Sequence, residues 1–172
     1  MRPSQQPDRI LVAYSGRLGS TGEIAAFIGR VLSEGGASVD VKAIDQVEEL
    51  GQYSRIVVGS AIRYDRWLSD AREFVKANRQ ALSEVPVALF FTCLAMVKPE
   101  GAAKAESYAR GLCTQLPGIN AADVGRFAGV LSLSKAPWLT RLMLRVISRI
   151  TGVKEGDYRD WNAIRAWSQG LN

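Results

Sequence analysis

Short apolar runs recur along the chain, separated by longer stretches in which apolar residues return at helical spacing. Four of the runs are almost continuously apolar, as expected of strands covered on both faces, and one is more polar. The pattern predicts five strands, at Ile10–Tyr14, Ser38–Ala43, Arg55–Gly59, Val87–Thr92 and Phe127–Leu133.

The stretches between these strands carry apolar stripes with the period of a helix. The first stripe follows a Ser-Thr pair, a common helix start, and stops at a Gly-Gly pair, a common helix end. The alternation of strands and helices predicts parallel strands joined by right-handed crossovers. The helical stretches begin near Ser20, Trp67 and Ala102.

We therefore expect a single α/β domain over residues 1–172, with a polar N-terminal tail at residues 1–8. The order that suits its five-stranded, doubly wound parallel sheet is 2-1-3-4-5, with helices on both faces. Ligands of such sheets bind at the carboxyl ends of the strands, where the winding reverses. The loops that matter are then Ser15–Thr21, Ser60–Trp67 and Cys93–Glu100.

The first of these loops contains Gly16 and Gly19 and leads into a helix at Ser20. Backbone N–H groups at such a helix start form an anion site. The glycine spacing matches neither the dinucleotide fingerprint nor the nucleoside-triphosphate loop. The loop suits one terminal phosphate, although an ordinary tight turn explains the same glycines equally well.

The chain contains no histidine and only two cysteines, Cys93 and Cys113. Without histidine, Ser-His-Asp and Cys-His catalysis and histidine-containing metal sites are excluded, so any chemistry needs a cofactor or carboxylates. The few cysteines favour a reducing compartment. Since no apolar run approaches the roughly 20 residues that span a bilayer, we expect a cytoplasmic protein, with a peripheral place on the inner face of the membrane as the alternative.

Five segments, in order along nearly the whole chain, carry a more specific signal: ILVAYSGRLGSTGEIAAFI, IVVGSAIRYDRWLSDAREFV, KPEGAAKAESYARGL, WLTRLMLRVISRITG and DYRDW. They resemble the flavodoxin-like family, and most closely its menaquinone-dependent protoporphyrinogen oxidases. The resemblance implies a flavodoxin-like fold and FMN as cofactor. It also implies two-electron oxidation of a porphyrinogen, as in heme biosynthesis, with electrons passed to a quinone.

Carried over by position, the resemblance implies which residues contact FMN. The first loop would surround the phosphate, with a hydroxyl from Thr21 and a charge from Arg17, and the other two loops would border the flavin ring. No side chain is assigned a catalytic role, because the flavin carries the hydride. The expected cofactor contacts are Ser15, Gly16, Arg17, Leu18, Gly19, Ser20, Thr21, Ala61, Ile62, Arg63, Tyr64, Thr92, Cys93, Leu94 and Ala95.

Two positions of the first loop depart from the family pattern. Gly16 stands where a Ser or Thr is usual, and Leu18 stands where a polar residue is usual. Two phosphate hydrogen bonds of about 1.5–3 kcal/mol each would then be missing. This keeps a second class open, a flavodoxin-like electron-transfer or binding module with weak or no FMN that acts through a protein partner.

Arg63 and Tyr64 are also the expected substrate contacts. Tyr64 would lie on or near the ring, and Arg63 would receive the carboxylates of a porphyrin-like substrate. We interpret Trp67 and Cys93 as core residues. A formal charge of +5 argues against an acidic electron shuttle and favours an anionic substrate or membrane surface, and no nucleic-acid-binding motif is present.

Residues 135–157 contain an additional amphipathic helix. Its apolar face joins Trp138 to Ile150, and Arg141, Arg145 and Arg149 form a basic stripe along the border. Such a helix can cover the sheet, or it can lie in a bilayer interface with Trp138 and the three arginines as membrane contacts. The second interpretation is open because residues 160–171, with Trp161, Ile164 and Trp167 on one stripe, can supply the cover.

Overall fold

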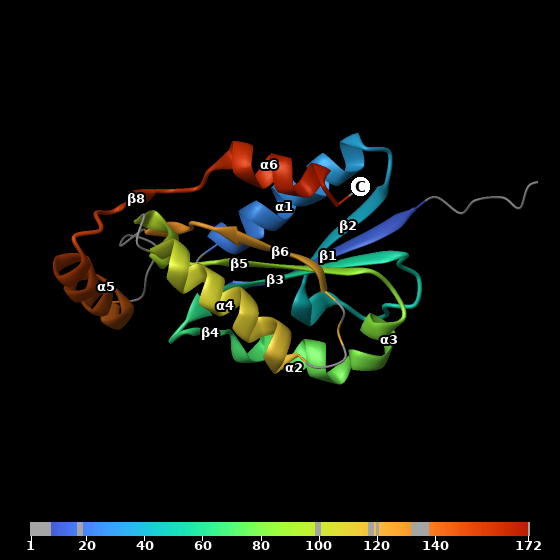
Figure 1. Ribbon diagram of the computed structural model, residues 1–172, viewed down its shortest axis with the longest axis horizontal. Helices are drawn as coiled ribbons and strands as arrows, with labels where there is room; N and C mark the ends of the chain where they lie inside the picture. The colour runs from blue at the N-terminus through green and yellow to red at the C-terminus, as the bar shows by residue number, and fades with distance from the viewer. Residues whose placement is uncertain are drawn as a thin grey trace, which may run out of the picture.

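A parallel sheet with helices on both faces forms the body of the molecule (Figure 1). The computed structural model describes residues 8–16, 19–98, 101–116, 119, 121–131 and 138–171. The strands are β1 (Arg9–Ser15), β2 (Ser38–Ala43), β3 (Arg55–Arg63), β4 (Arg66–Trp67), β5 (Val87–Thr92), β6 (Ala121–Phe127), β7 (Val130–Leu131) and β8 (Gly156–Asp157). The helices are α1 (Ser20–Glu34), α2 (Ser69–Ala77), α3 (Arg79–Ser83), α4 (Gly101–Gln115), α5 (Trp138–Thr151) and α6 (Trp161–Gln169), with short 3₁₀ turns η1 (Ile44–Gln46) and η2 (Leu94–Val97).

The main sheet has the order β2-β1-β3-β5-β6, and all of these neighbours pair in parallel. Counted in chain order, its five strands have the predicted arrangement 2-1-3-4-5, so the fold prediction is confirmed. Two short antiparallel pairs add to it: β4 folds back on β3, and β7 pairs with β8 outside the main sheet.

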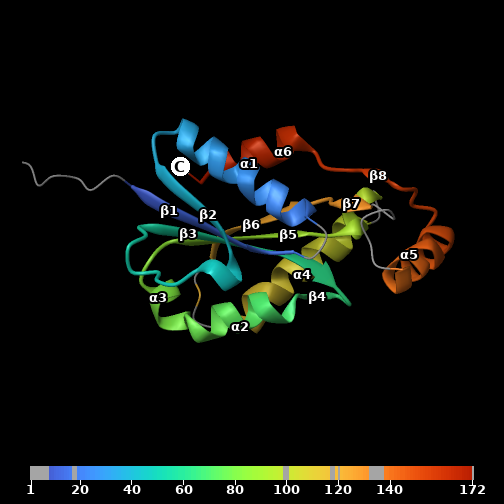
Figure 2. The same ribbon diagram turned by 180° about the vertical axis from the view of Figure 1, so that it is seen from behind.

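Alternating side chains of the strands build two cores, one on each face of the sheet. In β1, Ile10 and Val12 pack toward α1 and α6, whereas Leu11 and Ala13 belong to the core under α2 and α4. Figures 1 and 2 show these two helix layers from opposite sides. Burial on both faces explains why the central strands read as continuous apolar runs.

The prediction for the fifth strand is wrong in position. The expected strand was 127–133, but β6 ends at Phe127 and the apolar residues that follow form the separate strand β7. The cause is that β6 is an edge strand with Asp123 and Arg126 exposed, so its pattern is less apolar than that of the inner strands. Trp67 is buried as expected, but in β4 rather than at a helix start, and β3 extends to Arg63 to pair with β4.

Helix α6 supplies the cover that the outer part of the sheet requires. Asp160 caps it, since its carboxylate accepts hydrogen bonds from the backbone N–H groups of Asn162 and Ala163, both at 3.0 Å. Ile164 is fully buried in the core shared with α1. Helix α5, in contrast, stands beyond the end of the sheet, apart from both layers (Figures 1 and 2). Within the described ranges, no helix is long and apolar enough to span a membrane.

Replacing one isoleucine in each of these two helices should separate their roles. Ile164→Ala should lower the free energy of unfolding by about 2–4 kcal/mol, because it leaves a cavity in the core. Ile150→Ala, at a side chain that is 81% exposed, should change it by less than about 0.5 kcal/mol. Urea unfolding followed by circular dichroism measures both, and equal losses would show that α5 packs as α6 does.

Candidate functional site

Strand register brings the ends of β1, β3 and β5 into one row. Ser15 pairs with Ser60, Ala61 pairs with Thr92, and Thr92 pairs with Phe127. The three loops singled out in the sequence therefore lie together at the carboxyl edge of the sheet. Of the expected contacts, Ser15 ends β1 and Gly16 follows it, Gly19 is the N-cap of α1, and Ser20 and Thr21 begin that helix. Ala61 to Arg63 end β3 and Tyr64 follows them, Thr92 ends β5 and Cys93 follows it, and Leu94 and Ala95 start η2. Arg17 and Leu18 lie outside the described residues.

The start of α1 offers backbone donors that no side chain occupies. Gly19 stands at the N-cap position with a φ of 91°, in the left-handed region that favours glycine, and no side-chain hydrogen bond caps the helix. The first N–H groups of a helix lack partners within the helix and attract anions. This uncapped end contrasts with α6, which Asp160 caps.

The structure explains why a glycine stands at position 16. A Cβ atom at this position would lie 2.7 Å from the Cβ of Thr21, which is too close for any side chain. A Ser or Thr therefore cannot stand here unless the start of α1 moves. The departure reflects close packing of the loop against the helix.

Buried hydroxyls line the same edge. The Thr21 and Thr92 side-chain oxygens are 3.0 Å apart, and either can be the donor. Both residues are buried, so this bond ties the first turn of α1 to the end of β5. Ser15 Oγ donates to Asp70 Oδ2 at 2.7 Å, which holds the end of β1 to the start of α2.

The loop after β3 is a tight hairpin rather than an open loop. Arg63 pairs with Arg66 across it, and the two residues at its tip, Tyr64 and Asp65, have φ values of 50° and 61°. Such angles are uncommon for residues other than glycine and are found at tight turns and functional sites. Tyr64 is 76% exposed, and the Arg63 guanidinium lies 5.3 Å from its ring centroid. The hairpin thus presents an aromatic ring and a cation at the carboxyl edge.

Cys93 lies just past β5 and is buried among core residues. Its backbone N–H donates to the Phe127 carbonyl at 3.0 Å, and burial raises the pKa of its thiol. The thiol therefore stays protonated, which fits a small core residue and not a nucleophile.

A cavity of about 340 Å³ opens between the hairpin and α4. Asp65 lies at its rim, 3.0 Å from Lys104 Nζ, and accepts a hydrogen bond from the Tyr108 hydroxyl. The hydrogen bonds from Tyr108 and Lys104 lower the pKa of Asp65, and the hydrogen bonds of Lys104 with Tyr108 and Asp65 raise the pKa of Lys104. Arg66 adds a second cation to the lining, so positive charge exceeds negative charge there. A larger hollow of about 510 Å³ lies over α2 and α3, away from this edge.

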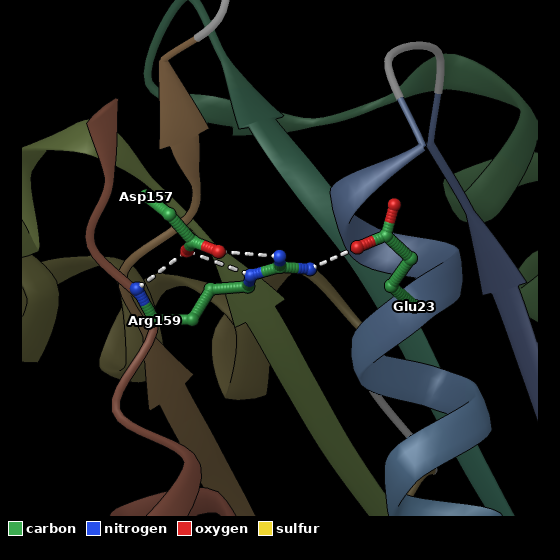
Figure 3. Close-up of polar contacts among 3 residues, drawn as sticks. All are labelled: Glu23, Asp157 and Arg159. Atoms are coloured by element: carbon green, nitrogen blue, oxygen red, sulfur yellow. Dashed lines mark hydrogen bonds and ion pairs between the residues drawn. The ribbon is translucent and has the colours of Figure 1, made fainter. Parts of the chain in front are cut away.

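The chain between β6 and α6, residues 128–160, carries β7, α5 and β8 and is called the excursion below. Arg159 joins this excursion to the first turn of α1 (Figure 3). Its guanidinium donates to both carboxylate oxygens of Asp157, at 2.8 and 2.5 Å, and to Glu23. Its side chain is only 9% exposed and lies over the Trp161 ring, 4.6 Å from the centroid. The network thus gives the Glu23 carboxylate a cationic partner in the first turn of α1.

Sequence reasoning missed both of these polar networks. Asp65 falls within IVVGSAIRYDRWLSDAREFV, Lys104 and Tyr108 fall within KPEGAAKAESYARGL, and Asp157 and Arg159 fall within DYRDW. These letters carried the family resemblance without an assigned role. Tyr108 bonds to Asp65 across 43 positions and Arg159 to Glu23 across 136, so no local pattern connects these partners.

The Arg159 network should make stability depend on acid pH. The hydrogen bonds from Arg159 lower the pKa of Asp157, so its stabilising effect is present above the ordinary value of 3.8 and is lost as the pH falls through the folded-state pKa. Asp157→Asn should lower the free energy of unfolding by about 1 kcal/mol at pH 7. The difference from the wild type should shrink below pH about 4. Urea titrations across pH measure it, with Asp45→Asn in η1 as the control, and a difference that persists unchanged in acid would contradict the assignment.

Comparisons with known proteins agree with this geometry. Residues 11–157 match the family model described as a flavodoxin domain. The chain is 32% identical to a protoporphyrinogen IX dehydrogenase [quinone] of Escherichia coli (strain K12) over 173 aligned positions, covering 95% of this chain and 94% of the relative.

Solved structures resemble the fold at lower identity. A short-chain flavodoxin associated with a non-canonical PDU bacterial microcompartment superposes with a TM-score of 0.62 at 11% identity, covering 95% of each chain. A Lactobacillus acidophilus NCFM flavoprotein in complex with FMN superposes with a TM-score of 0.51 at 14% identity, covering 70% of this chain and 93% of the other. The chain therefore belongs to the flavodoxin-domain family, and it is an oxidoreductase.

Proposed function

We propose that this protein is an FMN-dependent dehydrogenase that oxidises a porphyrinogen or a similar anionic reduced tetrapyrrole and uses a quinone as electron acceptor. The observation that carries the proposal is the pairing, at one edge of the sheet, of an uncapped helix start with an exposed aromatic hairpin. The name of the Escherichia coli relative, which matches nearly the whole chain, supports the same substrate and acceptor.

The residues present fit the phosphate of FMN. The N–H groups at the start of α1 have no side-chain cap, and Gly19 provides the turn that lets an anion approach them. Thr92 can donate its hydroxyl hydrogen to Thr21, which would leave the Thr21 hydroxyl free to donate toward a phosphate oxygen. Arg159 offsets the charge of Glu23 in the same turn. Backbone donors thus stand in for the hydroxyl that Gly16 cannot supply.

The hairpin and η2 are the natural borders of the flavin ring. Tyr64 follows β3 and offers an exposed aromatic face, and Leu94 and Ala95 begin η2 just after β5, the strand that pairs with β3. Bound FMN would supply the two-electron chemistry, taking two electrons from the substrate and giving them to the quinone. The protein's part is to hold the ring against these two segments and to orient the substrate. The strained tip at Tyr64 and Asp65 keeps the aromatic side chain presented to the site.

Cations at the hairpin suit a substrate that carries carboxylates. Arg63 lies in the hairpin that would border the flavin ring, and Arg66 and Lys104 line the cavity beside it. Lys104 is already paired with Asp65, which leaves the two arginines as the charges best placed to receive a carboxylate. We infer that Arg63 recognises the substrate and does not retain the cofactor.

The second candidate, a module that binds little or no FMN and acts through a protein partner, is favoured by one observation. Gly16 has no hydroxyl to offer a phosphate, and a Cβ atom there would lie only 2.7 Å from the Cβ of Thr21. The two candidates differ in one measurable property, the affinity for FMN.

Calorimetric titration of the full chain with FMN is the direct test. The wild type should bind FMN with a dissociation constant in the micromolar range or below. Thr21→Val should weaken binding by about 1–2 kcal/mol, or roughly 5- to 30-fold, because it removes the hydroxyl and keeps the shape of the side chain. Thr114→Val, on the exposed side of α4, is the matched control and should leave the affinity unchanged. A wild type that does not bind FMN at high micromolar concentration would favour the partner-protein module.

Arg63→Ala should change substrate recognition alone. In an assay of protoporphyrinogen oxidation with a quinone, KM should rise about tenfold or more, since a charge-assisted contact is lost, and kcat should change little. The flavin content of the purified variant should equal that of the wild type. Arg110→Ala, at an exposed position of α4, controls for the loss of one positive charge. Release of FMN from the Arg63 variant would show that the residue serves the cofactor instead.

A further inference from the structure

Helix α5 exposes a continuous apolar stripe. Trp138, Leu142, Val146 and Ile150 recur every four residues, and each side chain is more than half exposed, up to 77% at Trp138 and 81% at Ile150. Side chains spaced in this way lie on one side of a helix. Together they account for four of the six large apolar residues that the described part of the chain exposes. An apolar surface of this kind marks an interaction site.

Positive charge runs along one border of this stripe. Arg141, Arg145 and Arg149 each precede one of the apolar residues by a single position, and Arg145 and Arg149 are exposed. The sequence of α5 contains no acidic residue. The helix therefore has an apolar side, a basic border and an aromatic residue at its first position, which is the composition of helices that lie in a membrane interface.

The excursion that carries α5 is packed against the segment expected to border the flavin. Leu131 and Val153, on either side of α5 in the chain, form a small core with Leu94 and Val97 of η2. Strand β7 pairs with β8, and Arg159 then ties β8 to the first turn of α1. Figures 1 and 2 place α5 at the carboxyl end of the sheet, beyond β4. A surface bound by α5 would lie near the flavin end of the molecule.

We propose that α5 docks the protein on an anionic membrane surface, with its apolar stripe among the upper acyl chains and its arginines at the headgroups. Charge complementarity selects this occupant. A second copy of the chain would bring the same basic border against this one, and like charges would meet, whereas anionic headgroups are complementary along the full helix. The helix is about 20 Å long, so it would lie along the interface and not cross it.

Docking through α5 has a consequence for the electron acceptor. It would bring the carboxyl end of the sheet close to the bilayer, where an apolar quinone is concentrated. This consequence rests on the proposed function, but docking itself does not, because vesicle binding can be measured without turnover.

Co-sedimentation of the full-length protein with vesicles tests the proposal. The probes are vesicles of phosphatidylcholine with about one-third phosphatidylglycerol, and vesicles of phosphatidylcholine alone. The wild type should sediment with the anionic vesicles at low salt and much less at about 0.5 M salt, because screening removes the attraction. Each arginine should contribute roughly fivefold to binding, so reversing all three charges should reduce it by at least a hundredfold.

Two α5 variants and one control are compared with the wild type. Arg141→Glu/Arg145→Glu/Arg149→Glu reverses the basic border, and Leu142→Ser/Val146→Ser/Ile150→Ser removes the apolar stripe; both should stay in the supernatant. The matched control, Lys76→Glu/Arg79→Glu/Arg110→Glu, makes the same change in net charge at exposed positions of α2, α3 and α4 and should sediment as the wild type does.

Three results would overturn the proposal. One is a wild type that stays in the supernatant with anionic vesicles at low salt. Another is a control that loses as much binding as the α5 variants, which would reduce the effect to net charge. The third is a wild-type dimer, seen by light scattering, that the apolar-stripe variant makes monomeric, since the face would then bind a second copy. FMN content and reduction of a water-soluble quinone, measured on the same variants, tell a failure of docking from a failure of the proposed function.

Discussion

Parallel pairing of β1, β3 and β5 is the constraint on which the site depends. Because these strands are buried on both faces, a slip of one residue would turn core side chains to the wrong side, so the register is strongly specified. That register alone puts Ser15, Ala61 and Thr92 side by side. The start of α1, the hairpin and η2 directly follow these strand ends, so they lie together at one edge of the sheet.

Polar contacts convert this edge into a specific site. The bond between Thr21 and Thr92 fixes α1 to β5, and Arg159 fixes the excursion after β6 to α1 through Glu23. The threonine pair is buried, which makes the loss of one partner costly. In the second contact Arg159 is 9% exposed but Glu23 is half exposed. The N-terminal end of α1 is thus held by residues from distant parts of the chain.

The excursion between β6 and α6 differs from the body of the domain in how its apolar side chains are buried. Its strands and its small core hold it against η2, yet the helix at its centre turns apolar side chains to solvent. In α6 the apolar Ile164 is buried in the core, whereas the four apolar side chains of α5 named above are exposed. Binding to a surface outside the molecule would bury that exposed stripe.

The repeating apolar runs were sufficient to determine the α/β class, the strand order and the edge at which the loops meet, because two-sided burial leaves a local signature in the residues themselves. The edge strand β6 was misplaced since an exposed strand lacks that signature, and Trp67 was assigned to a helix because its hairpin partner Ile62 cannot be recognised from spacing. Gly16 looked like a lost phosphate ligand until packing against Thr21 explained it. The partners of Arg159 and the exposure of α5 were decided only by the tertiary structure, since both depend on which surfaces approach each other after the strands have paired.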